Sequence, residues 1–105
     1  MTPDEFRKIA LSFPDAEERS HMNHPDFRVG GKIFATLGPD LTWGMVKLTP
    51  NQQQEFLHSH PTVFKPSPGK WGEGGATAII LANANQEIAG EAMTLAWENT
   101  AQKHG

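Results

Sequence analysis

The candidate reactive side chains of this sequence are histidines, serines and carboxylates, because the chain contains no cysteine. The pairs His21-x-x-His24 and His58-x-His60 have spacings that a metal site could use, but such a site needs three or four converging ligands. The second pair lies at the end of an expected helix, which would send its side chains to different faces. We therefore interpret all four histidines as exposed turn and cap residues, with no metal.

No complete catalytic set can be assembled from the remaining residues. No nucleophile elbow or defensible Ser-His-Asp order includes any of the serines Ser12, Ser20, Ser59 and Ser67. No carboxylate pair stands isolated in apolar surroundings, as acid-base chemistry would require. The glycine-rich pieces lack the strand-loop-helix context that cradles phosphate. The sequence therefore predicts a non-enzymatic protein without a cofactor.

Cations and tryptophans outline a candidate binding surface instead. On an open sheet face and its bordering loop, cations could pair with phosphates while aromatic rings stack on bases. The same side chains would suit a protein or small-ligand partner. Alternatively, Trp71 packs over Trp43 and covers the face, which leaves the lysines merely solvated. The residues concerned are Arg28, Lys32, Trp43, Lys47, Lys70 and Trp71.

Charge is unevenly distributed along the chain, whose net charge is −3. The net charge argues against sequence-independent binding of nucleic acid by the whole surface. Between residues 27 and 72, however, five cations stand against two acids, whereas four cations stand against ten acids elsewhere. This pattern fits either one basic face or an acidic, solubilising shell.

The 105 residues suffice for one domain spanning 1–105, with a core large enough to fold without disulfides. The acidic, helix-like beginning does not resemble a signal peptide. The longest apolar run, Ala78–Ala82, is too short to cross a bilayer. We expect a soluble, cytoplasmic protein with no membrane partner.

The stretch from Phe27 to Leu48 must position the binding surface, since it reads as three strand-like runs separated by turns. Gly30-Gly31 predicts a tight hairpin, and Gly38-Pro39-Asp40 predicts the next turn. Within the second run, Ile33, Ala35 and Leu37 are predicted on one face, with Lys32, Phe34 and Thr36 on the other. In the third run, Gly44, Val46 and Leu48 are predicted to face the helices, which leaves Trp43, Met45 and Lys47 on the open side.

The flanking segments supply the helices. Thr2-Pro3-Asp4-Glu5 predicts a capped helix over residues 3–13, and Thr49-Pro50 begins a second, short helix. Residues 16–23 could form an edge strand, followed by a turn at His24-Pro25-Asp26. An irregular loop is expected from Pro61 to Gly75, with Phe64 and Trp71 pinning it to the body of the fold. A central strand, Ala76–Leu81, and a final helix capped by Asn83 or Asn85 would complete an α+β, two-layer fold: an antiparallel sheet with the N- and C-terminal helices on one face.

Five pieces of the sequence together match the pattern of one known family, in the same order: Leu11–Pro14, Phe27–Ala35, Val46–Pro50, Pro68–Gly72 and Leu95–Trp97. Through these pieces the chain resembles the MmcQ/YjbR family over nearly its full length. The resemblance implies a CyaY-like (frataxin-like) fold and a double-wing DNA-binding role. The family usually opens its last strand with Gly-Trp, whereas Gly75-Ala76 stands here, which removes one aromatic ring from the surface.

The frataxin-like resemblance also raises iron binding as a weaker alternative. Its ligands would be the acids of the first helix and its neighbour, Asp4, Glu5, Asp15, Glu17 and Glu18. Iron would need several of these oxygens to converge. Cap and solvent roles explain the same residues, so the sequence favours a module that binds DNA, protein or a small ligand.

Overall fold

The computed structural model describes residues 1–101, which form helices and an antiparallel sheet. The elements, in chain order, are α1 (Pro3–Leu11), β1 (Glu17–His21), β2 (His24–Val29), β3 (Lys32–Leu37), β4 (Trp43–Lys47), α2 (Pro50–Ser59), β5 (Phe64–Pro66), α3 (Gly69–Glu73), β6 (Ala76–Ile80), the 3-10 turn η1 (Leu81–Asn83) and α4 (Gln86–Ala101). The α+β class predicted from the sequence is confirmed. Within the described residues, no helix combines the length and apolar character needed to span a membrane.

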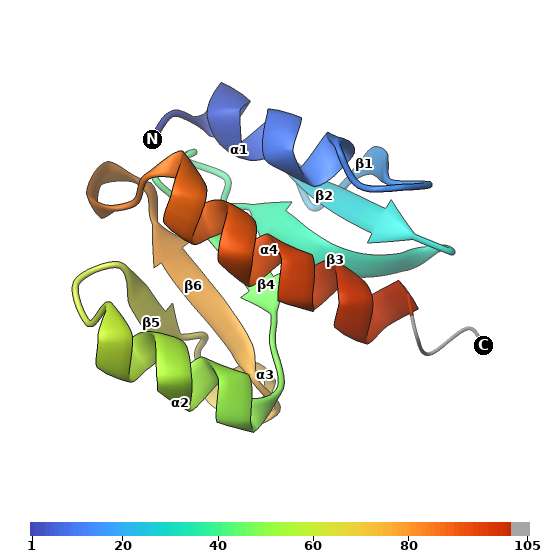
Figure 1. Cartoon of the computed structure of the whole chain (residues 1–105). Coiled ribbons are helices and arrows are strands. Elements are labelled where there is room, and N and C mark those ends of the chain that lie inside the picture. Colours follow the sequence, from blue (N-terminus) through green and yellow to red (C-terminus); the bar gives the residue numbers. More distant parts are fainter. Residues whose placement is uncertain (102–105) are drawn as a thin grey trace.

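The six strands form one sheet in the order β1-β2-β3-β4-β6-β5, and every neighbouring pair is antiparallel. Helices α1, α4 and α2 lie on the same side of this sheet (Figure 1). The charged β1 is an edge strand, as its sequence suggests. The fold therefore has one face covered by α1, α2 and α4 and one face that these three helices leave open.

Side-chain caps explain where the first two helices begin. The Thr2 hydroxyl accepts from the Glu5 amide while the Glu5 carboxylate accepts from the Thr2 amide, as predicted. Thr49 and Gln52 form the same reciprocal pair at α2. Asn85 accepts from the amide of Ile88 at the start of α4. The reciprocal pairs satisfy amides that a helix start leaves without partners.

Aromatic side chains fill the space between the helices and the sheet. Phe6 of α1 lies 6.0 Å from Phe27 of β2, and both are fully buried. Phe56 of α2 packs 5.0 Å from Phe64 of β5, so Phe64 does pin its segment to the core. Gly44 of β4 leaves room for the Phe6 ring, because a Cβ at this position would come within 2.5 Å of it.

A bulge in β3 overturns the predicted alternation of that strand. Phe27 pairs with Ala35 but Arg28 pairs with Ile33, so Phe34 is an extra residue on β3. Phe34 is consequently buried against Phe13 on the helix side rather than exposed on the open side.

The bulge also reverses the predicted positions of Lys32 and Ile33. Lys32 pairs with the core residue Val29 and therefore lies on the helix side, at the end of the sheet. Ile33 lies on the open side with Thr36. In β4, where no bulge occurs, the predicted faces are confirmed.

Two further expectations about local structure were wrong. The turn before β2 consists of Met22 and Asn23, whose φ angles are +49° and +69°, so residues 24–26 belong to the strand. The expected irregular loop of residues 61–75 contains β5 and α3. Residues with positive φ suit a tight hairpin, but methionine is rarely found there, so the turn has a weak sequence signal.

Candidate nucleic-acid or ligand-binding site

The candidate site lies on the sheet face that α1, α2 and α4 leave uncovered, called here the open face. Cross-strand partners share a face, so the register assigns to it alternate residues from every strand. Those from β1 and β2 are mostly polar or charged, whereas those from β3, β4 and β6 are mostly apolar. The open face therefore changes character across the sheet.

A hollow of about 610 Å³, called here the sheet groove, occupies the apolar part of this face. Met45 and Ala78 pair across β4 and β6 and form its floor, together with Thr36 and Trp43. Pro66 at the end of β5 also lines the groove, and the segment between β5 and β6 contributes Ser67, Pro68 and Trp71. His21 and His24 line the groove from β1 and β2, and Lys65 lines it from β5. Its volume is in the range of small-molecule sites.

Trp71, on the short helix α3, is the most exposed aromatic side chain of the groove, with 61% of its surface accessible. The α3 helix is held close to the preceding segment, since a Cβ at Gly72 would lie 1.8 Å from the Ser67 carbonyl oxygen. Gln53 of α2 also donates to the carbonyl oxygens of Gly72 and Ala76, at 3.0 Å each. The backbone below Trp71 is thus fixed from two sides.

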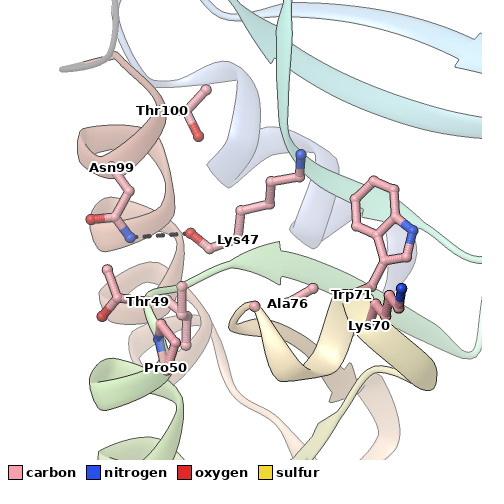
Figure 2. A pocket seen from close by; sticks show the side chains of 10 residues that line it. Lys47, Thr49, Pro50, Lys70, Trp71, Ala76, Asn99 and Thr100 are labelled. Carbon is pink, nitrogen blue, oxygen red and sulfur yellow. Dashed lines mark hydrogen bonds between the residues drawn. The ribbon is translucent and has the colours of Figure 1, made fainter.

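A second hollow of about 770 Å³ lies on the other side of Trp71, between α3 and the last turns of α4 (Figure 2). Lys47 and Lys70 line it, and the Lys47 ammonium lies 4.8 Å from the centre of the Trp71 ring. Asn99 closes its far side by donating to the Lys47 carbonyl oxygen at 3.1 Å. A cation over an indole ring is a favourable contact, so Trp71 and Lys47 position each other.

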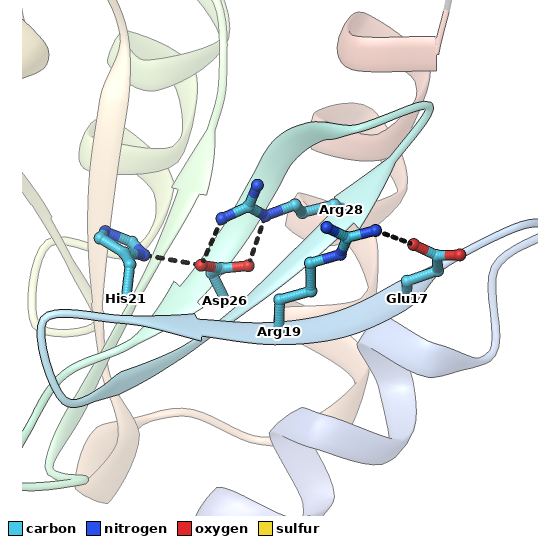
Figure 3. Close-up of polar contacts among 5 residues, drawn as sticks. All are labelled: Glu17, Arg19, His21, Asp26 and Arg28. Atoms are coloured by element: carbon cyan, nitrogen blue, oxygen red, sulfur yellow. Dashed lines mark hydrogen bonds and ion pairs between the residues drawn. The ribbon is translucent and has the colours of Figure 1, made fainter.

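The polar end of the open face is built around Asp26, whose carboxylate is fully buried (Figure 3). Arg28 donates to it twice, from Nε at 2.8 Å and from Nη2 at 3.1 Å. His21 Nδ1 lies 2.6 Å from Oδ2 of the same carboxylate. Hydrogen bonds from Arg28 hold the pKa of Asp26 below its ordinary value, although burial opposes them, and the His21 contact lowers it further. Asp26 is therefore an anion at neutral pH.

His24 sits beside this cluster, with its ring centre 4.4 Å from that of His21. Its Nδ1 atom is buried and has no hydrogen-bond partner among the described residues. Buried polar atoms normally have partners, so this nitrogen is unusual. The interpretation of His21 and His24 as exposed turn residues is wrong, because both belong to strands and both are half-buried.

The structure brings together some of the six residues predicted from the sequence as a binding surface. Trp43 and Trp71 line the sheet groove, and Lys47, Lys70 and Trp71 line the second hollow. Arg28 lies on the open face but is engaged with Asp26. Lys32 lies on the other side of the sheet. Trp71 does not cover the face completely, since the groove remains between it and the floor.

Besides Ile33, sequence reasoning missed four polar residues at or beside the groove: His21, His24, Asp26 and Lys65. Three of them were hidden by the unrecognised turn at Met22-Asn23, because a strand over residues 24–29 places His24, Asp26 and Arg28 on one face. Lys65 was hidden in the segment expected to be irregular. The alternation of polar residues with Pro25, Phe27 and Val29 was the available signal.

Four of the five acids considered for iron binding make other contacts. Asp4 and Glu18 both pair with Arg7, Glu17 pairs with Arg19, and Glu5 caps α1. Within residues 1–101, no group of three or more histidine or acidic side chains gathers in a way that could hold a metal ion.

Comparison with known proteins agrees with this architecture. The family model described as YjbR matches residues 11–99. A crystal structure of the Deinococcus radiodurans protein DR2400, which carries a DUF419 domain, is similar in fold. Its TM-score is 0.82 at 18% sequence identity, over 99% of this chain and 81% of that one. A comparison with curated proteins gives no match. On the extent of the family match, the chain belongs to the YjbR (MmcQ/YjbR) family.

Proposed function

We propose that the protein is a binding module that holds a small aromatic anion in the sheet groove. The observation that carries the proposal is a groove of about 610 Å³, floored by Trp43 and Met45 and walled by Trp71, on the sheet face that α1, α2 and α4 leave uncovered. Flat apolar walls with a few polar groups at the ends are typical of small-molecule sites. The rings of Trp43 and Trp71 would stack on the body of the ligand.

Charge complementarity supports a negative charge on the ligand. Lys65 lines the groove and makes no ion pair within the described residues, and Lys47 lies beside Trp71. None of the residues that line the groove is an acid, and Asp26, which contacts the lining residue His21, is offset by Arg28. The groove therefore offers an anion a cation without an opposing carboxylate.

The test is titration of the ¹⁵N-labelled protein with 2-naphthoate, followed by NMR. We expect saturable shifts of the indole N–H signals of Trp43 and Trp71, with a dissociation constant of about 1 mM or below for a probe of this size. Trp97 is an internal control, because its indole donates to the Pro14 carbonyl oxygen, away from the groove. Equal shifts of all three signals, or none, would contradict the proposal.

DNA contact is a second candidate function, favoured by the exposed Trp71 with Lys47 at its ring and Lys70 beside it. Arg28 is already engaged and Lys32 lies on the other side of the sheet, so few cations remain for phosphates. Contacts by Lys47 and Lys70 alone predict that log K falls with log salt at a slope of about −2.

The corresponding experiment is a salt titration of duplex DNA binding by the wild type, with Lys70→Gln and Lys32→Gln as a matched pair. Lys70→Gln should weaken binding and flatten the slope, whereas Lys32→Gln should change neither. Absence of binding at low salt would exclude this function.

A further inference from the structure

We infer that His21 is a ligand-contacting residue of the sheet groove, whose Nε2 accepts a hydrogen bond from an O–H or N–H group of the ligand. This inference rests on the proposed function and specifies its ligand class: an aromatic acid with a hydrogen-bond donor at the end opposite its anionic group. Asp26 and Arg28 act as positioning residues for the imidazole.

The protonation of the Asp26–His21 pair determines which ring nitrogen of His21 can accept a hydrogen bond. Asp26 is ionised, so its oxygens can only accept, and His21 Nδ1 must donate across the 2.6 Å contact. In the neutral imidazole a hydrogen on Nδ1 leaves a lone pair on Nε2. Figure 3 shows the second ring nitrogen turned away from Asp26. The pair therefore fixes one tautomer of His21.

The charges of Asp26 and Arg28 balance each other within the cluster that these residues form with His21. Arg28 binds the Asp26 carboxylate through two donors and already offsets its charge. A second positive charge on His21 is not needed to neutralise the buried anion. The neutral imidazole is the form that can accept at Nε2.

The His21 ring is accessible to a ligand in the groove. The His21 side chain is 39% exposed and lines the sheet groove, so a bound molecule can reach its ring. His24 packs on it and carries a buried nitrogen without a partner in the described part of the chain. The protein's own groups thus leave two imidazoles incompletely bonded at this end of an otherwise apolar groove.

The ligand class follows from the order of the strands. The histidines lie on β1 and β2, Trp43 and Met45 on β4, and Lys65 on β5 at the opposite edge. A ligand that crosses the strands therefore meets an acceptor, then aromatic and apolar side chains, then a cation. An aromatic body with a donor at one end and a negative charge at the other complements this order.

The experiment compares 6-hydroxy-2-naphthoate with 2-naphthoate at pH 8. The two probes differ only in the O–H group. The wild type should bind the hydroxylated probe about 3- to 10-fold more tightly, the gain from one hydrogen bond. Equal affinities would overturn this inference and leave the proposed function standing, whereas absence of binding by both probes would overturn both.

His21→Asn separates the groove contact from the structural role, because the asparagine amide can still donate to Asp26 but offers no acceptor at the Nε2 position. We expect this variant to bind the two probes with equal affinity, so that the preference for the hydroxylated probe is lost. His58→Asn, at an exposed position of α2, is the matched control and should retain the preference. A preference that survives in His21→Asn contradicts the inference.

A measurement on the wild type covers the case in which His21→Asn fails to fold. Histidine ring ¹⁵N spectra should show the Nδ1–H tautomer of His21 in the free protein. The hydroxylated probe should shift the Nε2 signal toward that of a hydrogen-bonded acceptor, and 2-naphthoate should not. The opposite tautomer, or equal responses to both probes, would overturn the assignment.

Discussion

The two faces of the sheet use adjacent residues of the same strands in different ways. On the helix side, Phe27 and Val46 are buried in a continuous apolar core. On the open side, their neighbours Asp26, Arg28 and Met45 form a buried ion pair and the floor of a groove. Packing explains the large apolar side chains that the strands place on the first face. On the second face, the exposure of Trp71 and the arrangement of His21 and His24 are not required by the core.

Because the two faces differ in this way, substitutions on one face should affect mainly stability and substitutions on the other mainly binding. Substitutions on the helix side should change the free energy of unfolding and leave the affinity of the folded protein for its ligand nearly unchanged. Substitutions in the apolar part of the open face should do the reverse. The Asp26 cluster lies between these extremes, because its carboxylate is buried while its histidine reaches the groove.

The largest expected effect is that of Phe27→Ala on the helix side. Phe27 is fully buried and lies 6.0 Å from Phe6, so truncation leaves a cavity and should cost about 3–5 kcal/mol of unfolding free energy. Urea denaturation measures this loss, and Leu41→Ala, at an exposed position, should cost less than about 0.5 kcal/mol. A small loss at Phe27 would mean that the helix side is not the main source of stability.

Asp26→Asn should have the next largest effect. The substitution leaves Arg28 without its anionic partner, at a cost of about 3 kcal/mol at pH 7, toward the low end for a buried pair because Arg28 is partly accessible to water. The ionised carboxyl stabilises the wild type above its ordinary pKa of 3.8. That stabilisation should disappear as the pH falls through the lower pKa of the folded state. Urea titrations at several pH values should therefore show the two proteins converging in acid, and a constant difference would contradict this assignment.

The sequence predicted the helix side better than the open side, and the reason is physical. Caps at Thr2 and Thr49 and the alternation in β4 are local signals, so the helices and the central strands could be located correctly. The bulge at Phe34 depends on long-range packing, which the local sequence does not indicate. The turn at Met22-Asn23 needs positive φ angles, which a methionine does not predict.

Each of those two local errors changed which side chains were predicted to belong to the candidate site. The bulge exchanged Lys32 for Ile33 on the open face, and the turn concealed Asp26. The sequence also did not predict which cations form ion pairs. Arg28 pairs with Asp26 because the two residues are neighbours on one face of the sheet. The tryptophans were found because their size and positions in or near a strand pattern are visible without the fold.

Gly72→Ala should have an intermediate effect that connects the two faces. The added Cβ would lie 1.8 Å from the Ser67 carbonyl oxygen, so the backbone of α3 must move. We expect a loss of about 1–3 kcal/mol together with weaker binding of 2-naphthoate, because Trp71 moves with α3. Gly90→Ala is the control, since a Cβ there meets nothing within 4 Å. Unchanged affinity in a clearly destabilised Gly72→Ala would show that the position of α3 does not shape the groove.

Trp71→Ala should have the smallest effect on stability and a clear effect on binding. Its side chain is 61% exposed and its contact with Lys47 lies at the surface, so the unfolding free energy should fall by less than about 1 kcal/mol. Loss of one aromatic wall should nevertheless weaken 2-naphthoate binding about tenfold. Urea denaturation and NMR titration of the same sample measure both quantities. If affinity were unchanged, Trp71 would be a cover for the sheet rather than a wall of the groove, and the open face would resemble the helix side in serving stability alone.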